Sequence, residues 1–156
     1  ELLSAVESIN QHQKTKLFNK IYKHYSGDLS GKVFALWGLS FKPNTDDMRE
    51  APSRVLINAL LDAGATVRAF DPEAMGEARK IYSGINKFVL CDSLYDVVEG
   101  ANALAIVTEW KHFWSPDFER LKEELIDTVI FDGRNLFDPN ELRNQGIDYY
   151  AMGRGL

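Results

Sequence analysis

Residues 33–52 read VFALWGLSFKPNTDDMREAP, and this stretch decides the fold. Its first five residues, 33–37, are apolar and suit a strand that is buried on both faces. Pro52 has the fixed φ that suits the first turn of a helix, so a second element begins there. The polar loop between them, 38–51, leaves a strand at its carboxyl end and enters a helix. Ligands of α/β sheets bind at such places.

The loop over 38–51 is longer than the roughly two to six residues usual for such a connection, and long ordered loops tend to be functional. Its cations, Lys42 and Arg49, favour an anionic ligand. Its carboxylates can hold these cations in position or favour the helix N-terminus; they are Asp46, Asp47 and Glu50. The alternative is a surface connection whose charges are merely solvated.

A standard NAD site is not expected in this loop. The Gly-x-Gly-x-x-Gly phosphate fingerprint is missing, because Gly38 is the only glycine of the pattern that is present. Asp71 ends the second predicted strand, where an acidic residue often binds a ribose. Because that role accompanies the missing fingerprint, we interpret Asp71 as a turn residue.

Strands and helices alternate along the rest of the chain with short connections. This alternation predicts a Rossmann-like, doubly wound parallel sheet of about six strands with right-handed crossovers. The strands are expected at 33–37, 66–70, 87–91, 103–108, 129–131 and 147–151. The helices are expected at 52–63, 73–82, 93–99 (with Ser93 as N-cap and Gly100 as stop), 116–125 (starting at Pro116) and 139–145.

A long amphipathic helix is expected to precede the sheet. Apolar residues recur at mostly helical spacing through residues 1–25, and Gly27 provides a stop. We therefore divide the chain into this helix, 1–25, and one domain, 31–156. No N-cap stands ahead of Glu1, which suggests a helix cut part-way along and hence a piece of a longer protein.

Composition narrows the function class. The chain has 156 residues, 45% of them hydrophobic, which suffices for the core of one domain. Its net charge of -5 argues against nucleic-acid binding, and its apolar runs are too short to span a membrane. A cytoplasmic protein is the default expectation. Cys91 is the only cysteine and is interpreted as packing at a buried strand end.

The loop motif GLSFKPNTDDMREAP resembles the nucleotide-sugar dehydrogenases of the UDP-glucose/GDP-mannose dehydrogenase family, and within it the bacterial UDP-glucose 6-dehydrogenases. The resemblance continues through the following motifs and so covers nearly the whole chain: AFDP (69–72), VTEWK (107–111), FDGRN (131–135) and GRG (153–155). It implies the NAD-dependent, twofold oxidation of UDP-glucose to UDP-glucuronate, which serves nucleotide-sugar metabolism and polysaccharide biosynthesis. The family's NAD-binding domain and catalytic cysteine have no counterpart in this chain, so it should be inactive alone.

The resemblance assigns roles to four residues. Phe41, Lys42 and Arg134 match residues that bind the UDP-sugar, and Arg49 matches an arginine that reaches the NAD held by the other domain. No catalytic residue lies in this chain. The helix over 1–25 resembles the end of the family's central helix, which forms much of a homodimer contact. A helix packed on its own domain remains the alternative.

Other readings stay open for particular residues. Arg134 could instead form a structural ion pair with Asp132 or Asp138. A metal site at Glu109 and His112 is not expected, because the further ligands of a di-iron site are absent. We expect the other two histidines, His12 and His24, to be solvated and not to bind a metal. We expect the aromatic residues Trp110, Phe113 and Trp114 to lie in the core or in an interface.

Two alternatives to UDP-glucose 6-dehydrogenase remain. The first is the same domain of a GDP-mannose or UDP-N-acetylmannosamine dehydrogenase, and the stretch NTDDM at 44–48 favours UDP-glucose over these. The second is a freestanding nucleotide-binding regulatory module. The gene sequence upstream of Glu1 discriminates, because a glycine fingerprint and a cysteine motif there support the enzyme.

Overall fold

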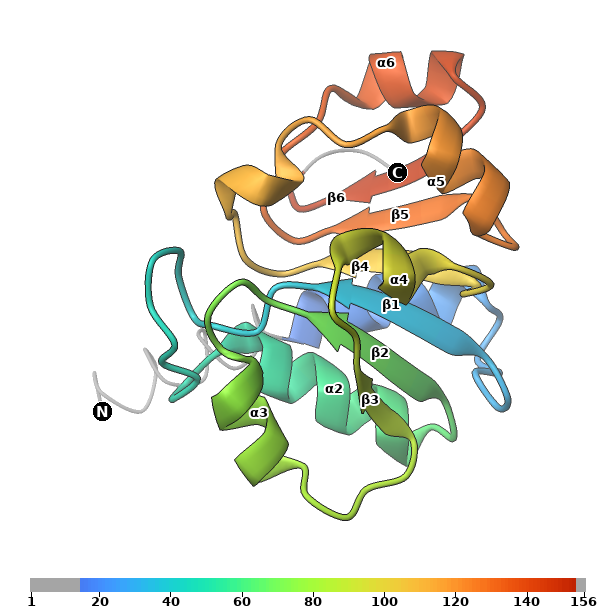
Figure 1. Ribbon diagram of the computed structural model, residues 1–156. Helices are drawn as coiled ribbons and strands as arrows, with labels where there is room; N and C mark the ends of the chain where they lie inside the picture. Colours follow the sequence, from blue (N-terminus) through green and yellow to red (C-terminus); the bar gives the residue numbers. More distant parts are fainter. Residues whose placement is uncertain (1–14, 154–156) are drawn as a thin grey trace, which may run out of the picture.

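The computed structural model describes residues 15–153. Within them, six strands form one parallel sheet, as the sequence predicted, and their order is β3-β2-β1-β4-β5-β6 (Figure 1). The strands are β1 (Val33–Trp37), β2 (Thr66–Phe70), β3 (Phe88–Leu90), β4 (Ala103–Ile106), β5 (Val129–Asp132) and β6 (Asp148–Ala151).

The central strand β1 pairs with β2 on one side and β4 on the other. Its side chains alternate between two cores. Phe34 and Leu36 belong to one core and Ala35 and Trp37 to the other, and all four are fully buried. Both faces of the sheet are covered at this strand, and for this reason its sequence is a continuous apolar run and does not alternate with polar residues.

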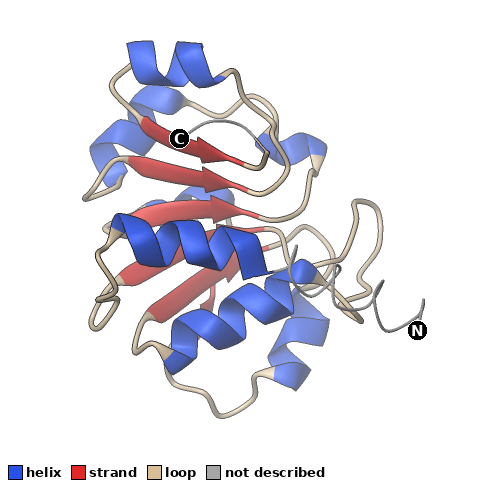
Figure 2. Cartoon of the chain, turned by 180° about the vertical axis from the view of Figure 1, so that it is seen from behind, coloured by secondary structure: helices blue, strands red, loops and turns tan. Residues whose placement is uncertain are grey.

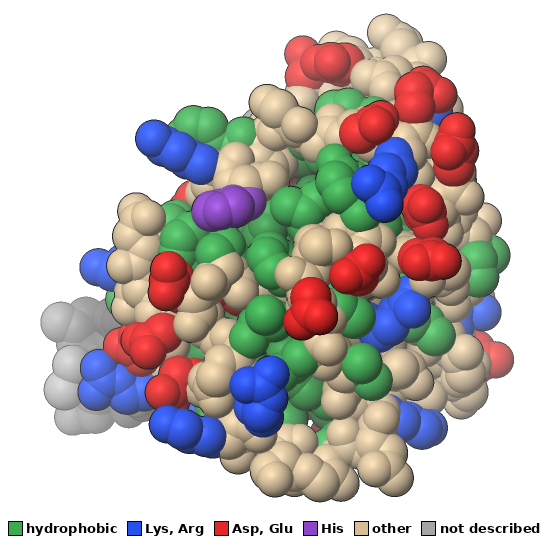
Figure 3. All heavy atoms as spheres, viewed as in Figure 1, with side chains coloured by type: hydrophobic (Ala, Val, Ile, Leu, Met, Phe, Trp, Pro, Cys, Tyr) green, Lys and Arg blue, Asp and Glu red, His purple; other side chains and the backbone are tan. Residues whose placement is uncertain are grey.

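Helices cover both faces of the sheet. Residues 15–24 are helical and pack with α2 (Pro52–Asp62) and α3 (Met75–Ile81) over one core; Figure 2 shows this side of the molecule. Three further helices enclose the second core on the opposite side, which Figure 3 shows: α4 (Leu94–Val98), α5 (Phe118–Glu124) and α6 (Pro139–Asn144). The order of the strands reverses direction between β1 and β4, so the carboxyl ends of these two strands flank the switch point of the sheet.

Helix starts follow the capping residues. The predicted N-cap at Ser93 is confirmed, since its Oγ accepts a hydrogen bond of 3.2 Å from the backbone N–H of Asp96. The predicted start of α5 at Pro116 is wrong. Asp117 caps this helix instead, accepting from the N–H of Arg120 at 3.1 Å, and the helix begins at Phe118. Serine and aspartate are about equally good caps, so the folded geometry and not the residue type places the start of this helix.

Several local predictions need correction. His24 is half-buried and not solvated: its Nδ1 lies 2.7 Å from the hydroxyl of Tyr150. Cys91 follows β3 and is half-buried, and this burial raises the pKa of its thiol. Trp110 is in the core, as expected, but Trp114 is 53% exposed. His12 lies outside the described residues.

A short 3-10 helix, η1 (Lys111–Phe113), follows β4 and was not predicted, because three residues carry no periodic signal. The strand before it is shorter than expected and ends at Ile106. Across residues 15–153, none of the helices has the length and apolar character needed to cross a membrane.

Candidate functional site

The buried carboxylate of Asp71 ties the loop over 38–51 to the sheet. One of its oxygens accepts hydrogen bonds from the backbone N–H groups of Leu39 at 2.7 Å and Ser40 at 3.0 Å, and from the indole N–H of Trp110 at 3.1 Å. The other oxygen accepts from the two backbone N–H groups at 73–74, both at 2.8 Å. Asp71 is a turn residue, as interpreted, and it also anchors the loop after β1.

The switch point between β1 and β4 is closed by contact between their following segments. Gly38 has a φ of +101°, and a Cβ on it would lie 2.6 Å from the Cβ of Thr108. The hydroxyl of Thr108 donates a 2.7 Å hydrogen bond to the carbonyl of Ser40. Position 38 therefore requires a glycine for two reasons: the backbone has a positive φ, and Thr108 packs where a side chain would lie.

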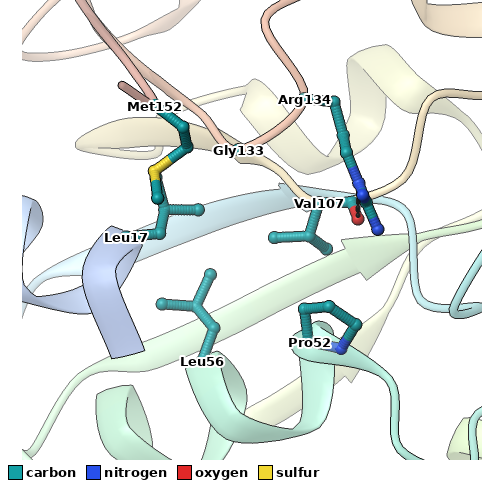
Figure 4. Close-up of a pocket in the computed structure, with 7 residues that line it drawn as sticks. All are labelled: Leu17, Pro52, Leu56, Val107, Gly133, Arg134 and Met152. Carbon is teal, nitrogen blue, oxygen red and sulfur yellow. Dashed lines mark hydrogen bonds between the residues drawn. The ribbon is translucent and has the colours of Figure 1, made fainter. Parts of the chain in front are cut away.

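An adjoining cavity of about 220 Å³ opens at the carboxyl ends of β4 and β5 (Figure 4). It lies between helical residues 15–24, the start of α2 and the segment after β6. Apart from the guanidinium of Arg134, the side chains that line it are apolar. The lining residues are Leu17, Pro52, Leu56, Val107, Gly133, Arg134 and Met152.

Arg134 places its guanidinium in the wall of this cavity and is held there by main-chain oxygens. Its Nε donates to the carbonyl of Val107 at 3.1 Å, and its Nη2 donates to the carbonyl of Phe41 at 3.3 Å. Its ion-pair partner is Glu109, with Oε1 lying 3.8 Å from Nε. Arg134 thus joins the segments that follow β1, β4 and β5.

The alternative of an ion pair between the side chains of Arg134 and Asp132 or Asp138 is wrong. From Arg134, Asp132 accepts a hydrogen bond of 2.8 Å that comes from the backbone N–H and not from the guanidinium, and Asp138 caps α6. The second oxygen of Asp132 accepts from Leu136 N–H at 2.7 Å and from the hydroxyl of Tyr149 at 2.6 Å. Asp132 therefore shapes the turn that presents Arg134.

The turn after β5 also positions the chain after β6. Asn135 has a φ of +57°, a conformation that asparagine tolerates better than most residues. Its side-chain amide donates to the carbonyl of Met152 at 2.9 Å and accepts from the N–H of Met152 at 2.8 Å. These paired bonds set the backbone from which the Met152 side chain reaches the cavity.

Phe41 and Lys42 lie on the loop beside Arg134. Phe41 is 37% exposed, and the Nζ of Lys42 lies 5.3 Å from the centre of its ring. The loop is held here by a hydrogen bond from the N–H of Phe41 to the carbonyl of Asp47 at 2.9 Å. The structure thus brings Phe41 to Arg134, with Lys42 beside the aromatic ring and outside the residues that line the cavity.

Arg49 lies apart from that cavity and borders a different hollow. Its guanidinium bonds the carboxylate of Asp47 through Nε at 3.1 Å and Nη2 at 2.9 Å, and its side chain is 88% exposed. These hydrogen bonds lower the pKa of Asp47 to about 2. Because the pKa of Asp47 is lower in the folded state, the pairing stabilises the fold above the ordinary pKa of Asp47. This stabilisation is lost as pH falls through about 2.

Sequence reasoning missed the partners that hold the site. Glu109 pairs with Arg134, whereas His112 packs edge-on against Trp110 at 5.9 Å. A usable signal was the repeated Phe-Asp at the ends of β2 and β5, where Asp71 and Asp132 anchor the following turns. Among residues 15–153, no group of three or more histidine, cysteine, aspartate or glutamate side chains could hold a metal ion.

Residues 35–139 match the model of a family described as the UDP-glucose/GDP-mannose dehydrogenase family, UDP binding domain. Over 157 residues the chain is 45% identical to a UDP-glucose 6-dehydrogenase of Pseudomonas aeruginosa, covering 99% of this chain and 35% of that protein. A UDP-glucose 6-dehydrogenase of Rhizobium meliloti is 37% identical over 98% of this chain and 34% of its own length.

A solved structure of a UDP-glucose dehydrogenase from the archaeon Pyrobaculum islandicum superposes with a TM-score of 0.77 at 25% identity. The superposition covers 94% of this chain and 31% of that one. The chain therefore spans about a third of the length of these relatives.

Proposed function

This chain belongs to the UDP-glucose/GDP-mannose dehydrogenase family, and from that premise we propose that it is the UDP-sugar-binding portion of a UDP-glucose 6-dehydrogenase. The parent protein oxidises the C6 alcohol of UDP-glucose to the carboxylate of UDP-glucuronate, reducing NAD in each of two steps. Binding and orientation of the nucleotide sugar are the tasks of this chain, and we expect no turnover from it alone.

The observation that carries this proposal is the guanidinium of Arg134 in the wall of the apolar cavity, beside Phe41. A guanidinium can grip a phosphate through two parallel hydrogen bonds. Nε and one N–H of Nη2 donate to carbonyl oxygens, and among residues 15–153 Nη1 makes no hydrogen bond. These remaining donors suit the diphosphate of a UDP-sugar. Lys42 supplies a movable second cation at the sugar end.

The cavity is smaller than a whole nucleotide sugar needs. Its volume of about 220 Å³ lies below the roughly 300–1,000 Å³ usual for ligand pockets. The remainder of the site is supplied by the rest of the parent protein, so the chain alone binds UDP-glucose weakly if at all. The same division makes residues 31–156 a binding domain and residues 1–25 the end of a linker helix.

NAD does not fit the switch point of this sheet. Gly38 and Thr108 are in contact there, and the carboxylate of Asp71, where a ribose would bond, accepts backbone N–H groups of the loop. We assign NAD to the part of the parent outside this chain. Arg49, with its exposed guanidinium, is the residue proposed to reach that cofactor.

The wider setting is also a proposal. We place the parent in the cytoplasm, as a homodimer acting in nucleotide-sugar metabolism for polysaccharide biosynthesis. The family description names both UDP-glucose and GDP-mannose enzymes. The sequence NTDDM at 44–48 favours UDP-glucose, and a GDP-mannose or UDP-N-acetylmannosamine substrate is the second candidate.

Calorimetry with UDP-glucose and GDP-mannose tests this function on both the 156-residue chain and its full-length parent. We expect the parent to prefer UDP-glucose and the chain to bind either ligand weakly. In the parent, Arg134→Ala should weaken UDP-glucose binding by about ten- to hundredfold, the loss of a charged hydrogen bond of about 1.5–3 kcal/mol. Arg143→Ala, which removes an arginine from α6, is the matched control. Tight, selective binding of GDP-mannose would overturn the assignment.

A further inference from the structure

We propose that Glu109 is a positioning residue for Arg134: it aims the guanidinium that binds the diphosphate of the nucleotide sugar. This inference rests on the proposed UDP-sugar site and extends it to a second residue. Glu109 lies just beyond β4, and its Oε1 is 3.8 Å from the Nε of Arg134. The side chains are 41% and 29% exposed, so the pair is only partly screened by solvent.

The main chain at Glu109 is held in place because the residues on either side of it form hydrogen bonds with other segments. The hydroxyl of Thr108 donates to the carbonyl of Ser40 at 2.7 Å. On the other side, the indole of Trp110 donates to the buried carboxylate of Asp71 at 3.1 Å. The carbonyl of Glu109 itself accepts from the indole of Trp114 at 3.2 Å, which adds a third tie.

Glu109 also adds a negative charge beside the guanidinium, which two carbonyl groups already hold by hydrogen bonds. Val107 and Phe41 accept from Nε and Nη2 through their carbonyls, and the Glu109 carboxylate adds a negative charge near Nε. An arginine side chain loses considerable rotamer freedom when it is held. The two carbonyl acceptors and the nearby carboxylate, carried by the segments that follow β1 and β4, reduce that freedom before a ligand arrives, so less rotamer freedom is lost on binding.

Two physical effects of Glu109 on an anionic ligand have opposite signs. As a negative charge near the site, Glu109 repels a diphosphate, so charge alone predicts that Glu109→Gln tightens binding. As a positioning group, it keeps Arg134 ready, so Glu109→Gln weakens binding. We expect the positioning effect to dominate, because the ligand's contact is with the guanidinium that Glu109 orients.

The test is UDP-glucose binding by the full-length parent, measured by calorimetry without NAD. Glu109→Gln should weaken binding roughly two- to fivefold, in line with ion pairs of modest exposure. Glu109→Asp retains the charge but shortens its reach, and it should weaken binding less. Glu73→Gln is the matched control, since it removes one exposed carboxylate that follows β2; it should leave binding unchanged or tighten it slightly.

Coupling to Arg134 separates positioning from a general loss of structure. In an Arg134→Lys background, Glu109→Gln should no longer weaken binding, because lysine lacks the fork that Glu109 orients. Tighter or unchanged binding in Glu109→Gln alone would overturn the inference, as would the same weakening in both backgrounds. If Glu109→Gln lowers the melting temperature so far that folding fails, Glu109→Asp carries the same comparison. Failure of the wild-type parent to bind UDP-glucose would instead overturn the proposed function.

Discussion

At the scale of single residues, Arg134 and Lys42 are held very differently although both are proposed to bind the same ligand. Arg134 is fixed by two carbonyl oxygens and Glu109, whereas Lys42 lies over the Phe41 ring on an exposed part of the loop. If both bind the ligand as proposed, we expect the arginine to fix the position of the phosphate and the lysine to adjust to the sugar. Their substitutions should differ accordingly.

Lys42→Ala in the full-length parent should lower kcat/KM for UDP-glucose by roughly ten- to hundredfold, since it removes a charged contact of about 1.5–3 kcal/mol. The affinity for NAD should barely change. Lys32→Ala is the control, because Lys32 precedes β1 at the opposite end of the strand and stacks on Tyr25. Steady-state kinetics measure both effects. If the two substitutions lower kcat/KM equally, Lys42 has no specific role in binding UDP-glucose.

Arg49→Ala should act on the cofactor. We expect a higher KM for NAD or slower hydride transfer, while UDP-glucose binding measured without NAD stays near wild type. The substitution also breaks the pair with Asp47, whose pKa should then rise from about 2 toward its ordinary value. Unfolding curves must accompany the kinetics. A loss of UDP-glucose binding in a folded Arg49→Ala variant would contradict the separation of the two sites.

Gly38→Ala should destabilise the fold strongly. Its Cβ would lie 2.6 Å from the Thr108 side chain and 2.8 Å from its backbone nitrogen, and its φ of +101° is unfavourable as well. Strain and overpacking together predict a loss of about 2–5 kcal/mol in the free energy of unfolding. Gly100→Ala is the matched control, with a φ of +72° in open space. Urea titrations that give equal losses would show that the contact with Thr108 is unimportant.

At the scale of elements, the helix over residues 15–24 packs on the sheet and still exposes apolar surface. Ile21 is fully buried in the core, whereas Tyr22 is 46% exposed and lies against Phe18 at 5.7 Å between ring centres. The part of the predicted helix over 1–14 lies outside the described residues. The role of residues 1–25 in a homodimer therefore remains a prediction.

We predict that the chain dimerises through residues 1–25, because an amphipathic helix leaves apolar surface that association would cover. Sedimentation of the whole chain should give a dimer at tens of micromolar or so, and deletion of residues 1–14 should shift it toward monomer. The circular dichroism of the shortened chain serves as the control for folding. A monomeric wild type at that concentration would refute the prediction.

The elements themselves were predictable where the sequence signal is local. β1 is a continuous apolar run, and α2 begins at its proline, so both were found close to their true bounds. The start of α5 was misplaced, because Ser115 and Asp117 are both good caps and only the folded geometry selects Asp117.

At the scale of the whole molecule, alternation of strands and helices predicted the fold, but not the contacts that complete the site. Phe41, Glu109 and Arg134 are far apart in sequence, and they meet because the segments after β1, β4 and β5 leave the same edge of the sheet. The predicted order of strands and helices is enough to place each of these segments at that edge. It does not say which carboxylate faces which cation, and so Asp132 was considered as a partner where Glu109 is found.

The strand order has a consequence for how the chain folds as it leaves the ribosome. β1 can pair with β2 as soon as residues 66–70 are made, yet its other edge receives β4 only after residues 103–106 emerge. For that interval the nascent chain carries an unpaired, apolar central strand, the type of edge that invites aggregation. We therefore expect the speed of synthesis between β2 and β4, and chaperone access during that interval, to influence the yield of native protein.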